Sequence, residues 1–234
     1  MAVSELSRPG AAARVARKVI IVEDHELLAQ TLALGLASRG YESRVVEPGP
    51  AVTVIDQAAD FRPDLVLLDL DLGSVDGLEL VDRLGALGAA VLLVTGCSDE
   101  SQLGAALALG AVGWVSKSEP FEQLLALSER ALRRDPLLPP ARRSELVRLG
   151  RSRLKQQRDL KARAAELTSR ERDVLAALLA GKSALEIAEE FVVSLGTVRS
   201  HIQAILRKLG VSNQLAAVAA VAQLPPSTAR SLHA

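Results

Sequence analysis

The stretch LVLLDLDLGSVDG, residues 65–77, joins a run of leucine and valine to three aspartates. Such a run of apolar residues is typical of a strand that is buried on both faces of a parallel sheet. Asp69 and Asp71 stand at its end, where carboxylates beside a core are costly unless they are paired. Asp76 precedes the expected helix over residues 77–87, so we interpret it as the N-cap of that helix. The stretch therefore predicts a buried strand that presents Asp69 at the edge of a sheet.

Short β-rich runs alternate with longer helical patterns throughout the first half of the chain. The expected strands are residues 19–22, 42–46, 65–69, 91–95 and 113–116. The expected helices are residues 26–38, 52–59, 77–87, 101–109 and 121–133. Five consecutive strand-helix pairs predict a doubly wound α/β domain in which helices cover both faces of a parallel sheet. Because ligands of such sheets bind at the carboxyl ends of the strands, we expect one site there.

The composition is that of a folded protein whose two halves differ in charge. The chain has 234 residues, 49% of them hydrophobic and 24% charged, which is enough for two ordinary domains. The single cysteine, Cys97, excludes an intrachain disulfide, and residues 1–16 lack the apolar segment of a signal peptide. We therefore expect a cytoplasmic protein without a membrane partner. Residues 1–136 have a net charge of −8 and residues 137–234 one of +8, which indicates different partners for the two halves.

A proline-containing break, DPLLPPARR at residues 135–143, separates the two halves. Residues 144–166 are rich in Leu, Ala, Arg, Lys and Gln and predict a helical linker. Their apolar residues are only partly periodic, so a coiled coil stays an alternative. Residues 137–167 hold nine basic and three acidic side chains. This linker is expected to attract the DNA backbone, to lie against the acidic first half when the protein is unphosphorylated, or simply to be a solvated helix.

The last third of the chain predicts four helices, over residues 169–180, 184–191, 194–209 and 213–222. Two capping boxes are expected at helix starts, Thr168 with Glu171 and Ser183 with Glu186, and Ser194 is a further N-cap. The short gap between the second and third helices indicates a helix-turn-helix. The third helix has a buried stripe of Val198, Ile202, Ile205 and Leu209. Its opposite side, suited to a major groove, carries Gly196, Arg199, Ser200, Gln203 and Arg207.

The acids at the strand ends suit transfer of a phosphoryl group to a carboxylate. Such a nucleophile needs charge neutralisation, which Mg²⁺ supplies in proteins. The candidate ligands are Asp24, Asp69, the main-chain carbonyl of Asp71 and, through water, Glu23. Lys117, after the fifth strand, is placed to face the phosphoryl group, and Thr95, at the end of the fourth, offers a hydroxyl.

Residues 18–133 resemble the receiver domain of bacterial two-component response regulators. The matching segments are VIIVEDHELL, LVLLDLDLGSVDGLEL, VLLVTG and GAVGWVSKSEPFEQLL, in family order and spacing. The resemblance implies the strand order 2-1-3-4-5, a sensor histidine kinase as partner and Asp69 as phosphoacceptor. It also implies an acidic pair at Glu23 and Asp24, a switch hydroxyl at Thr95, a functional lysine at Lys117 and a switch aromatic at Trp114. The sequence departs from the family pattern at Gly73, which replaces a proline, at Asp71, and in the bulk of Trp114.

Residues 167–221 resemble the DNA-binding domain of the NarL/FixJ (LuxR-type) regulators. The resemblance implies base contacts by Arg199, Ser200 and Gln203, and a dimer contact on the final helix. Better candidates for phosphate contacts are Thr197, Lys182 and Arg207. His201 has two alternative roles, a contact with a phosphate and a packed position in the core.

The two resemblances together indicate a non-enzymatic, phosphorylation-dependent regulator that binds promoter DNA as a homodimer. The expected parts are a flexible N-terminus (1–16), a receiver domain (17–135), a basic helical linker (136–166), an all-α LuxR-type domain (167–224) and a flexible tail (225–234). One alternative is a scaffold or anti-activator that works without phosphorylation. Another is a D-x-D aspartyl phosphatase. In that family, however, the D-x-D motif lies on the first strand of the fold and continues into Gly-Thr, and this Gly-Thr is absent here.

Overall fold

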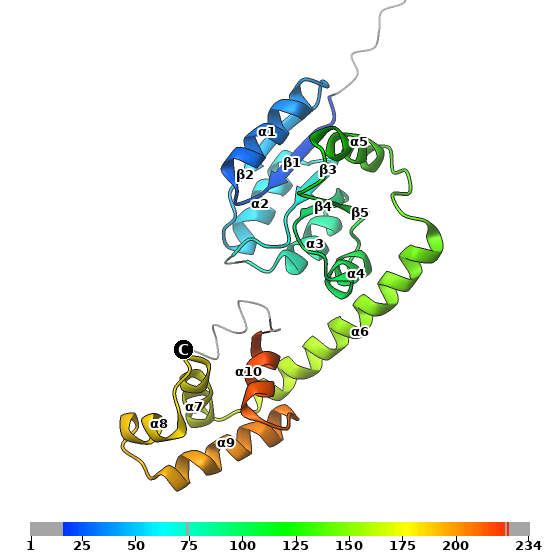
Figure 1. The fold of residues 1–234 in the computed structure, drawn as a ribbon. Helices are drawn as coiled ribbons and strands as arrows, with labels where there is room; N and C mark the ends of the chain where they lie inside the picture. The colour runs from blue at the N-terminus through cyan, green and yellow to red at the C-terminus, as the bar shows by residue number, and fades with distance from the viewer. Residues whose placement is uncertain (1–15, 74, 223, 225–234) are drawn as a thin grey trace, which may run out of the picture.

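The computed structural model describes residues 16–73, 75–222 and 224, and these form an α/β domain and a helical domain joined by one long helix (Figure 1). The segments 1–15 and 225–234, which include most of the expected flexible ends, lie outside the described residues. The strands are β1 (Lys18–Val22), β2 (Glu42–Val46), β3 (Leu65–Leu68), β4 (Ala90–Thr95) and β5 (Gly113–Ser116). The helices of the same domain are α1 (Glu26–Ala37), α2 (Ala51–Phe61), α3 (Gly77–Ala86), α4 (Glu100–Ala108) and α5 (Phe121–Leu132). These bounds confirm the expected elements to within two residues.

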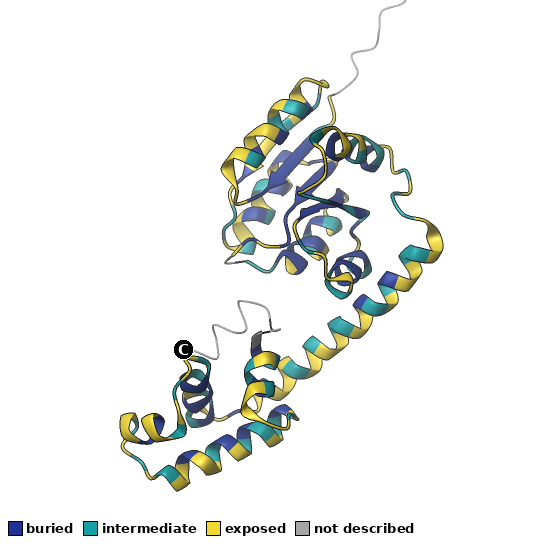
Figure 2. Cartoon of the chain, in the orientation of Figure 1, coloured by how far each residue is buried: buried dark blue, intermediate teal, exposed yellow. Residues whose placement is uncertain are grey.

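The sheet is parallel and has the order β2-β1-β3-β4-β5, as expected. Helices α1 and α5 cover one face, and α2, α3 and α4 cover the other. The strands β1, β3 and β4 are buried on both faces, which explains their valine and leucine content (Figure 2). Parallel pairing brings the carboxyl ends of the strands to one edge: the Asp69 amide donates to the Val22 carbonyl, and the Lys117 amide to the Thr95 carbonyl.

The second domain is built from α7 (Ser169–Leu179), α8 (Ala184–Glu190), α9 (Leu195–Leu209) and α10 (Gln214–Ala222). Both expected capping boxes are present at the starts of α7 and α8, and Ser194 caps α9. The expected apolar stripe of α9 is buried in the core of this domain. The sequence pattern was sufficient to predict these helices, because each helix start has its own capping side chain and each apolar stripe has helical spacing.

One continuous helix, α6 (Pro140–Ala165), connects the two domains. It begins four residues earlier than expected, because proline is well suited to the first turn of a helix, where an N–H has no intrahelical partner. Near its start, the fully buried Leu146 belongs to the core between the sheet and α2, α3 and α4. At its other end, Ala164 is buried in the core of the second domain. The two cores therefore share one helix.

Helix α6 lies against α4, where Gly150 meets the backbone of Gly104 and Arg153 pairs with Asp99. This agrees with the placement of the basic linker against the acidic half, and its dependence on phosphorylation stays a prediction. The attraction of the linker for DNA also stays a prediction. Among the described helices, none has both the length and the apolar character needed to cross a bilayer.

Truncation of the buried linker leucine, Leu146→Ala, is expected to destabilise the α/β domain by about 2–4 kcal/mol, because it leaves a cavity in a closed core. Urea unfolding followed by the fluorescence of Trp114, the only tryptophan of the chain, measures this change. Leu34→Ala is the matched control: its side chain is 73% exposed, so we expect a change below about 0.5 kcal/mol. Equal stability of the two variants would contradict the packing of α6 on the domain.

A second prediction concerns Glu171, a buried carboxylate in the capping box of α7. Its Oε2 accepts hydrogen bonds from the Thr168 amide and from Lys208 Nζ, both at 2.7 Å. Burial raises the pKa of Glu171, but the hydrogen bonds from Lys208 and Thr168 outweigh it, so the pKa lies below its ordinary value of 4.5. The ionised carboxylate therefore stabilises the fold above that pH, and this stabilisation is lost as the pH falls through the lowered pKa.

Glu171→Gln is accordingly expected to lower the free energy of unfolding by about 1–2 kcal/mol at neutral pH. Its difference from the wild type should shrink as the pH falls from 4.5 through the lowered pKa, since the wild-type carboxyl becomes protonated over that range. Urea unfolding followed by circular dichroism across this pH range measures both. Asp173→Asn, in an exposed pair with Arg170, is the control and should change stability little at any pH. A Glu171→Gln difference that does not depend on pH would refute the role of the charge.

Candidate functional site

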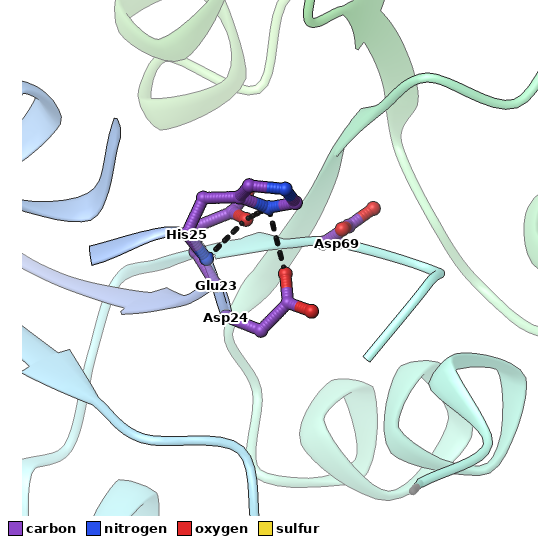
Figure 3. Close-up of side chains that lie close together, drawn as sticks. All are labelled: Glu23, Asp24, His25 and Asp69. Carbon is purple, nitrogen blue, oxygen red and sulfur yellow. Dashed lines mark hydrogen bonds and ion pairs between the residues drawn. The ribbon is translucent and has the colours of Figure 1, made fainter. Parts of the chain in front are cut away.

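Four side chains gather at the carboxyl edge of the sheet, on the loops that follow β1 and β3 (Figure 3). Glu23, Asp24 and His25 follow β1, and Asp69 follows β3. One ligand atom from each lies within 4.8 Å of the others. Glu23 and Asp69 are buried, with exposed fractions of 4% and 2%. Two buried ionised carboxylates this close repel each other unless a cation compensates their charge.

Lys117 supplies a compensating charge within the chain. It follows β5, and its Nζ donates to Glu23 Oε1 and to Asp69 Oδ2, each at 2.7 Å. Burial lowers the pKa of Lys117, but its hydrogen bonds to Asp69 and Glu23 outweigh this and raise the pKa above its ordinary value. The amine is therefore charged, and it bridges acids from two strand ends. It lies at the edge of the sheet where the sequence predicted it.

His25 is a member of this cluster that sequence reasoning missed. Its Nδ1 lies 2.7 Å from Glu23 Oε1 and 2.8 Å from Asp24 Oδ1. The hydrogen bond to Glu23 raises the pKa of His25. For Asp24, burial raises the pKa, but Glu23, His25 and Lys117 together outweigh burial and lower it. The available signal was the position of the histidine, directly after the acidic pair.

Two buried carboxylate oxygens, Glu23 Oε2 and Asp69 Oδ1, have no hydrogen-bond partner among the described residues. Such atoms are costly to bury unless a further group meets them. The donor set is oxygen-rich and carries more negative than positive charge, which fits a hard divalent cation. The adjoining cavity of about 610 Å³ is lined by Asp24, Asp69, Asp71 and Lys117, together with Gly73, Gly96, Cys97 and Gln102 among others. Sequence reasoning also missed Cys97, in the loop between β4 and α4, and Gln102, in the first turn of α4, which both line the cavity.

The remaining expected site residues lie around this centre. Thr95 is buried at the end of β4, and its Oγ1 accepts a hydrogen bond of 3.1 Å from the Cys97 amide. Trp114 is half-buried and packs against the core on the α4 side of the sheet. Asp76 Oδ1 accepts from the Leu78 amide at 2.9 Å, which confirms it as the N-cap of α3, and burial raises the pKa of its carboxyl.

The second candidate surface is the solvent side of α9. The expected contact residues Thr197, Arg199, Ser200, Gln203 and Arg207 are all exposed on it. His201 is half-buried between this side and the core stripe. Lys182 is less available for a phosphate, because its Nζ pairs with Glu190 Oε2 at 2.7 Å. The hydroxyls of Thr197 and Ser194 lie 2.9 Å apart, so Thr197 is part of the first turn of α9.

Two family models match the chain. The model described as "Response regulator receiver domain" covers residues 19–129. The model described as "Bacterial regulatory proteins, luxR family" covers residues 165–221. The first match contains the acidic cluster and Lys117, and the second contains α7 to α9 and most of α10.

Relatives match over both domains. The glycerol metabolism activator of Pseudomonas putida is 30% identical over 211 residues, which cover 86% of this chain and 93% of the relative. The transcriptional regulatory protein DesR of Bacillus subtilis (strain 168) is 29% identical over 204 residues, 86% of this chain and 94% of its own. A crystal structure of full-length FixJ from B. japonicum is similar with a TM-score of 0.45 and 24% identity, over 88% of this chain and 96% of that one. From the sequence matches, the chain belongs to the response regulators that combine a receiver domain with a LuxR-type helix-turn-helix domain.

Proposed function

We propose that this response regulator is a transcription factor whose DNA binding is controlled by phosphorylation of Asp69. A sensor histidine kinase is the donor, and promoter DNA in the cytoplasm is the target. The observation that carries the proposal is the state of the Asp69 carboxylate. One of its oxygens pairs with Lys117, and the other is buried, unpaired among the described residues and next to an open cavity.

The transfer itself needs little from the protein beyond position and charge. An Asp69 oxygen attacks the phosphorus of a phosphohistidine, a P–O bond forms and the P–N bond breaks. The electron pair stays on the departing imidazole nitrogen. Lys117 stays charged and faces the oxygens of the new phosphoryl group, while Glu23 keeps the lysine at the edge of the sheet.

The residues that would hold Mg²⁺ are Asp24, Asp69 and the main-chain carbonyl of Asp71, with Glu23 reaching it through water. Bound there, the ion would neutralise charge between the carboxylate and the incoming phosphoryl group. His25 adjoins this set, with its Nδ1 2.7 Å from Glu23 Oε1 and 2.8 Å from Asp24 Oδ1.

The output lies in the helical domain. In this proposal Thr95 and Trp114 respond to the phosphoryl group, the protein dimerises, and α9 enters the major groove. Arg199, Ser200 and Gln203 read base edges, and Arg207, Thr197 and His201 contact phosphates, as does Lys182 once it leaves its pair with Glu190. Support comes from the exposure of the first three on a helix whose opposite side is buried.

Incubation with a small phosphodonor and Mg²⁺ is expected to add one base-labile phosphate to the wild type and none to Asp69→Asn. The reason is that the asparagine amide is a poor nucleophile in a nearly isosteric side chain. Intact mass before and after mild alkali measures the label. Asp71→Asn is the control: it keeps the main-chain carbonyl and should still accept phosphate, with a changed lifetime. A wild type without label, or equal label on Asp69→Asn, would refute the proposal.

On duplexes enriched from a random pool, Arg199→Ala is expected to cost about 1–3 kcal/mol and to relax base preference at one position in each half-site. Arg207→Ala should instead weaken binding on all sequences alike and reduce the salt slope by about one. Fluorescence anisotropy titrations at several salt concentrations separate the two effects. Uniform losses for both variants would rule out base reading by Arg199.

A further inference from the structure

A cavity of about 710 Å³ lies between α3 and the second half of α6. It shares no described lining residue with the cavity beside Asp69. Its volume is within the range of about 300–1,000 Å³ that is typical of sites for small molecules. Neither the proposed phosphoryl transfer nor the proposed reading of DNA uses this cavity.

Part of the lining is apolar and belongs to the surface of the receiver core. Leu78 of α3 is only 7% exposed, and Leu109 and Leu154 are half-buried against the same core. These three leucines, which we name the apolar floor, come from α3, from the end of α4 and from α6. A ligand that covers the floor with an apolar group removes this surface from water, which favours binding.

The α6 side of the cavity is basic. The second half of this helix contributes four exposed side chains at spacings of four, three and three residues, which place them along one side: Arg151, Lys155, Arg158 and Lys161. None of the four has an ion pair or a hydrogen bond with another residue that the structure describes. By contrast, Arg142 and Arg153 of the same helix pair with Glu100 and Asp99 at the start of α4. The positive charge that the receiver domain leaves uncompensated on α6 therefore faces the cavity.

The α3 side is acidic, but most of its charge is already engaged. Glu79 pairs with Arg83 at 3.5 Å, and Asp76 Oδ1 accepts from the Leu78 amide at 2.9 Å. Asp82 is exposed and has no partner among the described residues. With five basic and three acidic side chains, the lining has a net charge of +2. This charge favours an anion over a cation of the same size.

We propose that this cavity binds an amphipathic anion, a carboxylate on an apolar chain. The chain covers the apolar floor, and the carboxylate pairs with Lys155 and Arg158, whose three-residue spacing allows one head group to meet both. A simple inorganic anion would leave the floor exposed, and a hydrophobic cation would face four unpaired basic groups. The proposal thus follows from the apolar floor and the basic side together.

Such a ligand contacts the receiver domain and the helix that connects the two domains at the same time (Figure 1). Because it binds α3 and α6 where they flank one cavity, it stabilises that arrangement by mass action. The cavity is therefore a second input to this regulator, separate from Asp69.

The test is isothermal titration calorimetry of the full chain with decanoate, decyltrimethylammonium and inorganic phosphate as probes. Decanoate should bind at least about tenfold more tightly than either of the other two. Octanoate should bind about tenfold more weakly than decanoate, because it buries two fewer methylene groups. Asp69→Asn should bind decanoate as the wild type does. Hydrogen exchange over residues 77–83 and 151–161 should slow about twofold or more when decanoate is added.

Two variants remove one basic group each from the proposed head-group site. Lys155→Gln and Arg158→Gln should each weaken decanoate binding about threefold or more. Arg148→Gln is the matched control, because Arg148 is an exposed arginine of the same helix outside the described lining, and it should leave the affinity unchanged. Circular dichroism confirms that all three variants are folded.

Absence of decanoate binding in a chain that does acquire base-labile phosphate would overturn this site and leave the proposed function intact. Equal affinity for decanoate and decyltrimethylammonium, or an equal loss in Arg148→Gln and Arg158→Gln, would also overturn it. A decanoate affinity that falls as the protein concentration rises would show that a second copy occupies the cavity instead. Binding to phosphatidylglycerol vesicles without affinity for free decanoate would assign the basic side to a membrane surface and overturn the proposal.

Discussion

The buried ion pair network of Lys117 with Asp69 and Glu23 is the interaction on which the receiver half depends. Two carboxylates at a strand edge are nearly inaccessible to water, and the ammonium group bridges both at 2.7 Å. It brings together the ends of β1, β3 and β5, so correct strand order is a condition for forming it. Yet one oxygen of each acid has no partner among the described residues. Lys117 therefore compensates part of the buried negative charge, and the two unpaired carboxylate oxygens are left for a ligand.

The fold was largely predictable because its signals are local. The buried strand at residues 65–68 has no polar side chain, and the starts of α7, α8 and α9 each carry a capping side chain that the structure confirms. The location of the site was predictable because the carboxyl ends of parallel strands lie at one edge of the sheet. Which atoms pair there was not predictable: the capture of the Thr95 hydroxyl by Cys97 and the insertion of His25 between two acids depend on loop geometry.

The docking of α6 was the least predictable feature. Gly104 and Gly150 are distant in sequence, and each alone resembles an unfavourable glycine within a helix. Only their contact in space explains them, because any side chain at either position would separate the helices. The charge asymmetry of the chain is explained in part by the same contact. Basic side chains of α6, among them Arg142 and Arg153, meet acidic ones at the start of α4.

Since α6 contributes Leu146 to one core and Ala164 to the other, the two domains are mechanically continuous. We propose that modification of Asp69 reaches α9 through this continuity. The most direct measurement is the affinity of the full chain for an enriched operator duplex with and without Mg²⁺ and beryllofluoride, compared between wild type and Asp69→Asn. The account predicts tighter binding by the treated wild type, about fivefold or more, and no change for Asp69→Asn. Equal affinity of the treated and untreated wild type would contradict it.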